Sequence, residues 1–132
     1  MNSQAFDESL IIAKKIVTFF ESKLIGSVLL LDIGLEKSLI NDIDIAISER
    51  NLFKIKEYLQ DNGYIETRAS YKQAGYADTI GNLRFEKPLY IPIHLSLIDK
   101  NFKLYSTYEI IAKKFERKNK SDVKQLTYLL TK

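Results

Sequence analysis

The most regular pattern of hydrophobic and polar positions lies in the segment Asn41–Ile47, where aspartate and isoleucine alternate. Alternation with a period of two favours a β-strand, in which side chains two residues apart point to the same face. Asp42 and Asp44 are therefore expected on one face of a sheet, and the isoleucines on the opposite face. The repulsion between two neighbouring carboxylates favours a bound cation.

Apolar periodicity, turn residues and capping signals predict the other elements. We expect helices over residues 3–23, 51–62, 106–117 and 121–131, and strands over 39–47, 64–71 and 89–98. Residues 76–80 are expected to pair with 83–86 across a turn at Gly81-Asn82, and 27–33 is compatible with a short helix or a strand. This order predicts an α+β fold with a short mixed sheet, helices mainly on one side, and a site on the open face.

Length and composition predict one domain over residues 1–132. The chain is 45% hydrophobic and 28% charged, as in ordinary globular proteins, and it contains no cysteine. It shows no signal-peptide pattern and no apolar segment of the ~20 residues that would span a bilayer. We therefore expect a cytoplasmic protein without a membrane partner, and a net charge of +3 does not by itself indicate nucleic-acid binding.

Small residues at Gly26-Ser27, the segment Gly34–Ser38 and the aspartates of Asn41–Ile45 together resemble the signature of the nucleotidyltransferase superfamily. In that superfamily a Gly-Ser or Gly-Gly pair precedes an Asp-x-Asp on a strand. The order is most similar to a small bacterial branch that includes lincosamide- and aminoglycoside-type nucleotidyltransferases and abortive-infection toxins. The segment Ile110–Asp122 is similar to the helix pair that follows such domains, which here falls at about residues 106–131.

The resemblance implies a minimal nucleotidyltransferase-like fold that binds a nucleoside triphosphate with Mg²⁺ or Mn²⁺. Asp42 and Asp44 would hold the metal, and Gly26 and Ser27 would contact phosphate through backbone N–H and hydroxyl groups. The nucleotidyl group would go to a hydroxyl on a small molecule, an RNA or a protein. The alternatives are solvated carboxylates at a strand end and, for Gly26-Ser27, a plain turn or helix cap.

The third carboxylate of the family is missing from the matching segment Tyr90–Leu95, where Pro92 occupies its position. His94 could ligate metal or act as a base, or could be a hydrogen-bonded strand histidine. Glu86 could replace the carboxylate, or could be solvated. Because a proline cannot donate to a sheet ladder, we expect Pro92 at an edge or a bulge.

This departure supports a second interpretation, in which the chain is a catalytically degenerate binding or regulatory module. Such a module would act in a toxin–antitoxin or defence pair, with a protein partner or as a homodimer. A weaker similarity links the chain to the GrpB-like group, through Gly26-Ser27, Asn62-Gly63-Tyr64 and the segment Arg84–Leu95.

Two further groups of residues have structural and functional interpretations. A basic cluster is either a solvated helix face or an attractor for a triphosphate or an RNA; its members are Lys113, Lys114, Arg117, Lys118 and Lys120. A group of tyrosines is either core or a base-stacking platform, namely Tyr64, Tyr71, Tyr76 and Tyr90.

Overall fold

The computed structural model describes residues 3–70, 79–98 and 106–131. In chain order its elements are α1 (Ser3–Phe19), β1 (Lys23–Ile25), η1 (Gly26–Ile33), η2 (Lys37–Leu39), β2 (Ile43–Ser48), η3 (Glu49–Asn51), α2 (Leu52–Asp61), β3 (Ile65–Ser70), β4 (Thr79–Glu86), β5 (Ile93–Ile98), α3 (Thr107–Arg117) and α4 (Lys120–Thr131), where η marks a 3-10 helix.

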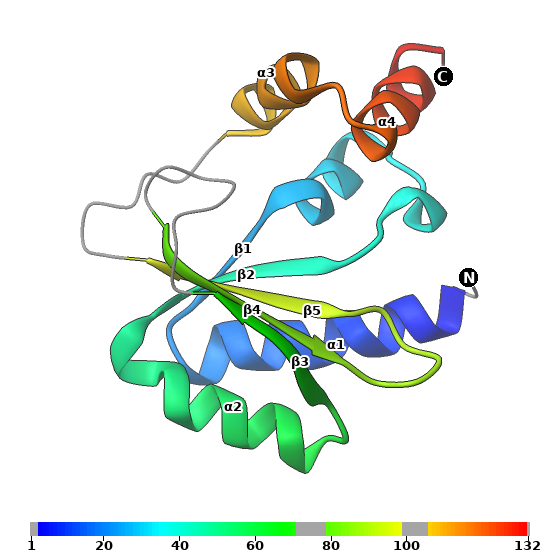
Figure 1. Ribbon diagram of the computed structural model, residues 1–132. Helices are drawn as coiled ribbons and strands as arrows, with labels where there is room; N and C mark the ends of the chain where they lie inside the picture. Colours follow the sequence, from blue (N-terminus) through cyan, green and yellow to red (C-terminus); the bar gives the residue numbers. More distant parts are fainter. Residues whose placement is uncertain (1–2, 71–78, 99–105, 132) are drawn as a thin grey trace.

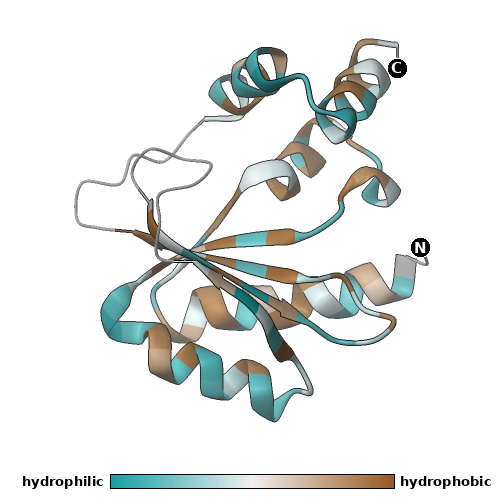
Figure 2. Cartoon of the chain, in the orientation of Figure 1, coloured by the Kyte–Doolittle hydropathy of each residue, from teal (hydrophilic) through white to brown (hydrophobic). Residues whose placement is uncertain are grey.

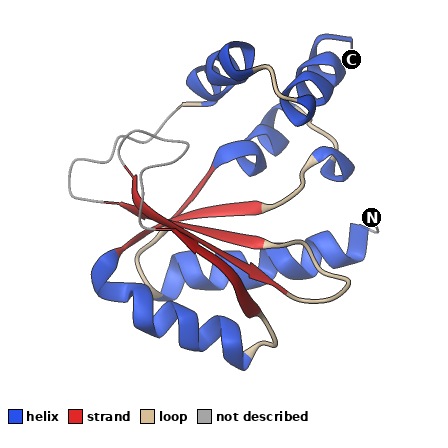
Figure 3. Cartoon of the chain, in the orientation of Figure 1, coloured by secondary structure: helices blue, strands red, loops and turns tan. Residues whose placement is uncertain are grey.

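The strands of the described residues form one mixed sheet in the order β1-β2-β5-β4-β3. The neighbours β2 and β5 are parallel, and the other neighbouring pairs are antiparallel. Figure 3 shows α1 and α2 along one side of the sheet, whereas the hairpin of α3 and α4 lies beyond the other side and packs on η1 and η2. The predicted α+β class with a short mixed sheet is confirmed, and the helices that pack on the sheet, α1 and α2, lie on one side as expected.

One face of the sheet is apolar and buried. Alternating apolar and polar positions follow β2 and β5 (Figure 2), so each strand sends its branched aliphatic side chains to the same side. There they form one core with α1 and α2, whose buried members include Phe6, Ile16, Ile45, Ile55, Leu59, Phe85 and Leu95. The opposite face keeps the polar side chains and remains open for a site.

The helices α3 and α4 form a hairpin that packs on the 3-10 helices η1 and η2 (Figure 1). The capping box predicted at the start of this pair is confirmed, because Ser106 Oγ accepts from Glu109 N and Glu109 Oε1 accepts from Ser106 N. Lys118 ends α3 in a left-handed conformation with φ 50°, which turns the chain back into α4.

The predicted hairpin turn at Gly81-Asn82 is wrong. Residues 79–86 form the single strand β4, which is paired on both sides, and the register shifts between Thr79 and Gly81 as at a β-bulge. Gly81 has no positive φ, although the tight turns predicted from glycine require one. The glycine therefore marks a bulge inside a strand, and Asn82 lies opposite Ser96 of β5.

Several element boundaries also differ from those expected. The strand with the aspartates begins at Ile43 instead of residue 39, because η2 precedes it, and β5 begins at Ile93 instead of residue 89. The expectation that Pro92 lies at a sheet edge or a bulge is wrong: it directly precedes β5, the middle strand. The carbonyl of Pro92 accepts a hydrogen bond from Ile43 N at 3.0 Å. Because proline has no backbone N–H, Pro92 joins the ladder through this carbonyl and cannot donate to it.

The proposed tyrosine platform is not supported by the two tyrosines that the structure describes. Tyr64 is buried, lies 3.1 Å from the hydroxyl of Ser9 on α1, and meets Tyr90 edge to face at 6.4 Å. These are core contacts, and Tyr71 and Tyr76 lie outside the described residues. No helix in the described part of the chain has the length and apolar character needed to cross a membrane.

Candidate functional site

A cavity of about 630 Å³ is lined by residues of the open face of the sheet and of the α3–α4 hairpin. Its walls come from segments that are far apart in the sequence: η1, the strands β2, β5, β4 and β3, and both helices of the hairpin. The predicted site residues Gly26, Ser27, Asp42, Asp44 and His94 all line this cavity. The fold therefore brings the whole predicted set together.

Asp42 and Asp44 lie at the start of β2 on the polar face, as the alternation predicts. Their side chains are 34% and 21% exposed, so both are partly withdrawn from water. Burial, together with the negative charge of Asp44, raises the pKa of Asp42 to about 6. A pair with this property favours a cation, because a positive ion would relieve both the burial and the mutual repulsion.

Gly26 lies against Asp44 in a way that excludes every other amino acid. It has φ 75°, a left-handed conformation, and a Cβ built on it would collide with Asp44 Oδ2. The pairing of Ile25 with Asp44 across β1 and β2 fixes this close approach. The predicted proximity of the glycine to the aspartates is therefore confirmed, and Gly26 lines the cavity beside Asp44.

The hydroxyl of Ser27 is held by the helical hairpin. It accepts a hydrogen bond from Lys114 Nζ at 2.8 Å and donates one to Gln125 Oε1 at 3.2 Å. Gln125 also donates from Nε2 to the carbonyl of Leu39 at 2.8 Å. The orientation of Ser27 toward the cavity is thus set by two helices that lie roughly a hundred residues later in the chain.

His94 and Asp44 are neighbours across the parallel strands β5 and β2. His94 Nδ1 lies 2.8 Å from Asp44 Oδ1, within hydrogen-bond distance. Burial lowers the pKa of His94, but the hydrogen bond to Asp44 and the charges of both aspartates outweigh burial and leave the pKa raised. Asp44 therefore uses one oxygen for the imidazole and directs the other toward Gly26.

Arg84 connects the remaining carboxylates of this face. It lies opposite His94 on β4, with its guanidinium 3.6 Å from Asp42 and 3.8 Å from Glu86. Glu86 does not line the cavity, and its side chain is 45% exposed. Glu86 therefore pairs with Arg84 outside the cavity and does not replace the missing third carboxylate, whereas His94 lies in the cavity next to Asp44.

One part of the site was missed by sequence reasoning. Lys114 belongs to the basic cluster, for which a solvated helix face and an attractor for a triphosphate or an RNA are the two interpretations, yet its side chain is buried at only 3% exposure. Its Nζ donates to Asp122 Oδ1 at 3.1 Å, and burial lowers its pKa despite that partner. Asp122 is 2% exposed and also accepts from Arg117 at 3.1 Å. The sequence does carry a signal for the burial of Lys114. It lies four residues after Ile110, so both side chains are on the same, buried face of α3.

The aspartate pair can hold a metal ion only with help from a ligand. Among residues 3–70, 79–98 and 106–131, no group of three or more His, Cys, Asp or Glu side chains could hold a metal ion by itself. Mg²⁺ in phosphoryl-transfer sites is commonly bound by one or two carboxylates together with substrate phosphates and water. The two neighbouring carboxylates, one with a raised pKa, fit a site in which substrate phosphates and water complete the coordination of the metal.

Comparison with known proteins identifies no relative. No protein-family model matches the chain, and no curated protein and no solved structure matches it either. The functional argument therefore depends on the residues and geometry of the cavity.

Proposed function

We propose that this protein binds a nucleoside triphosphate with Mg²⁺ or Mn²⁺ and transfers its nucleotidyl group to an acceptor hydroxyl. The observation that carries the proposal is the contact between Gly26 and Asp44 at the wall of the cavity, beside Asp42. It joins a backbone without a side chain to a pair of carboxylates, which is the combination that a metal-bound triphosphate requires.

The chain's own residues divide the binding task. The backbone N–H of Gly26 and the hydroxyl of Ser27, which both line the cavity, would contact phosphate, and Lys114 adds positive charge beside Ser27. Asp42 and the Gly26-facing oxygen of Asp44 are the groups that would hold the metal. When bound, the metal would supply the charge that stabilises the triphosphate and the departing pyrophosphate.

His94 has the arrangement of a general base. In its neutral form, with Nδ1–H donating to Asp44, the ring keeps Nε2 as the atom that accepts a proton. The acceptor oxygen attacks the α-phosphorus, the bond from that phosphorus to pyrophosphate breaks, and the acceptor proton passes to Nε2. The hydrogen bond to Asp44 would fix the orientation and tautomer of the ring for this step.

Calorimetric titration with ATP, GTP, CTP and UTP in the presence of Mg²⁺ tests the proposal. We expect at least one nucleotide to bind, and Asp42→Asn together with Asp44→Asn to weaken that binding at least tenfold, since a metal-bridged contact is lost. Asp32→Asn, an exposed carboxylate on η1, is the matched control and should leave affinity unchanged. Absence of binding by the wild type, or equal binding by the double variant, contradicts the proposal.

A second candidate function is a catalytically inactive binding or regulatory module of the same fold. Pro92 favours it, because this residue precedes β5 where it neighbours Asp42 across the parallel pair, and a proline offers no metal ligand there. Such a module would bind a nucleotide or a partner protein without releasing pyrophosphate. Pyrophosphate release that depends on Asp44 and on an acceptor would exclude this candidate.

A further inference from the structure

The cavity carries more positive than negative charge, even though it contains the aspartate pair. Three aspartates line it, against five cationic side chains: Arg68, Arg84, Lys113, Lys114 and Arg117. Three of these cations have carboxylate partners, since Arg84 pairs with Asp42, and both Lys114 and Arg117 pair with Asp122. Cationic side chains therefore outnumber the aspartates in the cavity wall.

Arg68 is an exposed cationic residue at the β3 end of the cavity. It lies on β3, directly opposite Arg84 of β4, so two guanidinium groups occupy neighbouring positions on one face. Like charges in this arrangement repel and destabilise the strand pair. Arg84 is neutralised by Asp42 and Glu86, whereas Arg68 has no carboxylate within 4.0 Å in the described residues. An anion bound between the sheet and α3 would remove the repulsion.

The position of Arg68 separates it from the donor end of the cavity. Gly26 and Asp44 belong to the β1–β2 side of the sheet, and Arg68 to the β3 edge. Three strand spacings separate Asp44 from Arg68, roughly 14 Å at about 4.8 Å each. Arg68 therefore lines the cavity at the end opposite Gly26, with β5 and β4 between them. His94 on β5 lies between the two ends, where an acceptor hydroxyl has to meet the donor phosphorus.

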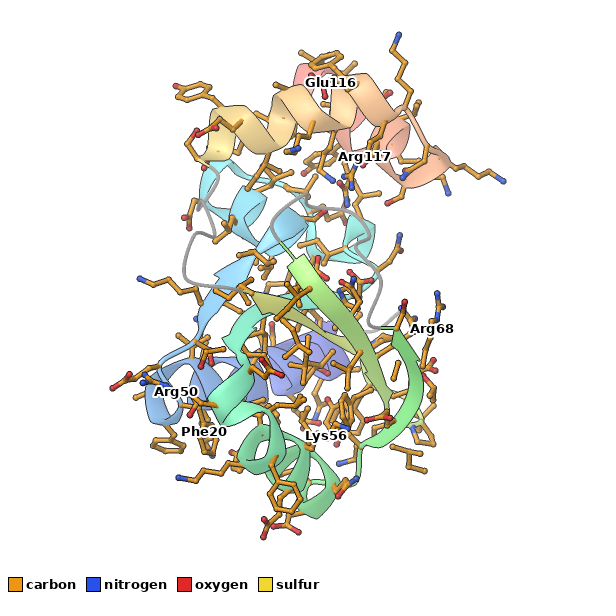
Figure 4. The ribbon with its side chains drawn as sticks, turned by 60° about the vertical axis from the view of Figure 1, so that its left-hand side comes forward. Phe20, Arg50, Lys56, Arg68, Glu116 and Arg117 are labelled. Atoms are coloured by element: carbon orange, nitrogen blue, oxygen red, sulfur yellow. The ribbon has the colours of Figure 1, made fainter. Side chains whose placement is uncertain are left out.

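We propose that the β3 end of the cavity, at Arg68 with Arg117 on the facing helix, binds a phosphate group of the acceptor substrate. Figure 4 labels Arg68 on the sheet and Arg117 on the helical hairpin above it, and both line the cavity. Guanidinium groups recognise phosphate through paired hydrogen bonds. The acceptor class is then a phosphorylated compound with a free hydroxyl, and the cationic β3 end of the cavity disfavours polycationic acceptors such as polyamines. This inference rests on the proposed nucleotidyl transfer.

Binding measurements without nucleotide or metal test the acceptor site directly. The probes are ribose 5-phosphate, ribose, spermidine and a 5′-phosphorylated single-stranded oligonucleotide, titrated against the full chain by calorimetry at low salt. We expect ribose 5-phosphate to bind, and ribose and spermidine not to bind. Arg68→Ala should weaken ribose 5-phosphate about tenfold, the scale of one charged phosphate contact, and Arg68→Lys should restore part of the loss.

The oligonucleotide identifies the source of the phosphate. An affinity at least tenfold above that of ribose 5-phosphate, with the same loss in Arg68→Ala, assigns the site to a nucleic-acid acceptor, and equal affinity assigns it to a small phosphorylated molecule. Arg50→Ala is the matched control, because Arg50 is an exposed arginine outside the cavity that pairs with Glu21 at 3.1 Å (Figure 4). It should bind all probes as the wild type does.

The failure of this inference differs from the failure of the proposed function. Nucleotide binding with Mg²⁺ that is lost in Asp44→Asn, combined with no Arg68-dependent binding of ribose 5-phosphate, overturns the acceptor site and leaves nucleotide binding intact. A tenfold loss of nucleotide affinity in Arg68→Ala also overturns it, because Arg68 would then belong to the donor site. Binding of spermidine by the wild type contradicts the assigned charge of the acceptor.

Discussion

Asp44 shows how a single side chain links the two halves of the candidate chemistry. Its Oδ1 lies 2.8 Å from the His94 ring, while its Oδ2 lies against the backbone of Gly26. The first contact raises the pKa of the imidazole, and the second places a carboxylate oxygen beside the phosphate approach. If the proposed chemistry holds, loss of Asp44 should affect both metal binding and proton transfer, whereas Asp42 makes no hydrogen bond to His94 and its loss should affect mainly metal binding.

At neutral pH the ionised carboxylate of Asp42 should lower the free energy of unfolding. The folded protein binds the Asp42 proton more tightly than the unfolded chain does, with a pKa of about 6 against 3.8. The stability contributed by this group is thus complete below pH 3.8 and is lost as the pH rises through 6. Asp42→Asn removes the ionisation, so in metal-free buffer at pH 7.5 it should raise the free energy of unfolding by about 1 kcal/mol. The full shift in pKa would correspond to about 3 kcal/mol, and the expected value is smaller because the side chain of Asp42 is 34% exposed to solvent.

Urea unfolding at pH 7.5 and at pH 4 measures this effect, and the gain in Asp42→Asn should shrink toward zero at pH 4. Asp7→Asn is the control, because Asp7 forms a half-exposed surface pair with Lys37 at 2.7 Å and should change stability by less than about 0.5 kcal/mol. An Asp42→Asn variant that is less stable than the wild type at pH 7.5 would show that the contact with Arg84 outweighs the repulsion from Asp44.

At the scale of elements, the parallel pair β2 and β5 decides what the site contains. Each strand could be predicted from its alternation, and so could the faces that carry the aspartates and His94. Their pairing could not, because register and strand order depend on contacts between segments about fifty residues apart. The same limit explains Gly81-Asn82, where the local signal for a turn is overridden by two neighbouring strands.

The pairing of β2 with β5 also predicts the effect of restoring a third carboxylate. Ile43 lies opposite Ile93, so the preceding residues, Asp42 and Pro92, are neighbours on the polar side. Pro92→Asp should therefore complete a three-carboxylate site and raise Mn²⁺ affinity at least tenfold. Without metal, the added charge should lower the free energy of unfolding by about 1 kcal/mol, since like charges lie on adjacent strands.

Calorimetric titration with Mn²⁺ and urea unfolding in EDTA check both parts of this expectation. Pro88→Asp is the matched control, because Pro88 is the other proline of the chain and lies exposed before β5. It introduces the same charge away from the aspartates and should leave Mn²⁺ affinity unchanged. Equal affinity in Pro92→Asp and the wild type would mean that position 92 does not face the metal site.

The whole molecule places an apolar core on one side of the sheet and a polar cavity on the other. The core could be predicted from periodicity, because branched aliphatic residues alternate along the strands and recur along α1 and α2. The position of the α3–α4 hairpin, which forms the roof of the cavity, could not be predicted. Polar contacts hold the hairpin in place, and these contacts leave no periodic pattern in the sequence. Lys114 looks like its neighbour Lys113 in sequence, and only the folded hairpin brings it to Ser27 and Asp122.

The buried pair of Lys114 and Asp122 should control how firmly that roof is attached. Removing Lys114 leaves the buried carboxylate of Asp122 with Arg117 as its remaining cationic partner, so Lys114→Met should lower the free energy of unfolding by about 2 kcal/mol. Adding Asp122→Leu removes this carboxylate and should recover more than half of that loss, since apolar replacements of a buried pair are commonly tolerated. Urea unfolding of the single and double variants gives the coupling energy, with exposed Lys124→Met as a control expected within about 0.5 kcal/mol. Additive losses in the double variant would mean that each residue stabilises the roof through other contacts, such as the hydrogen bond from Lys114 to Ser27.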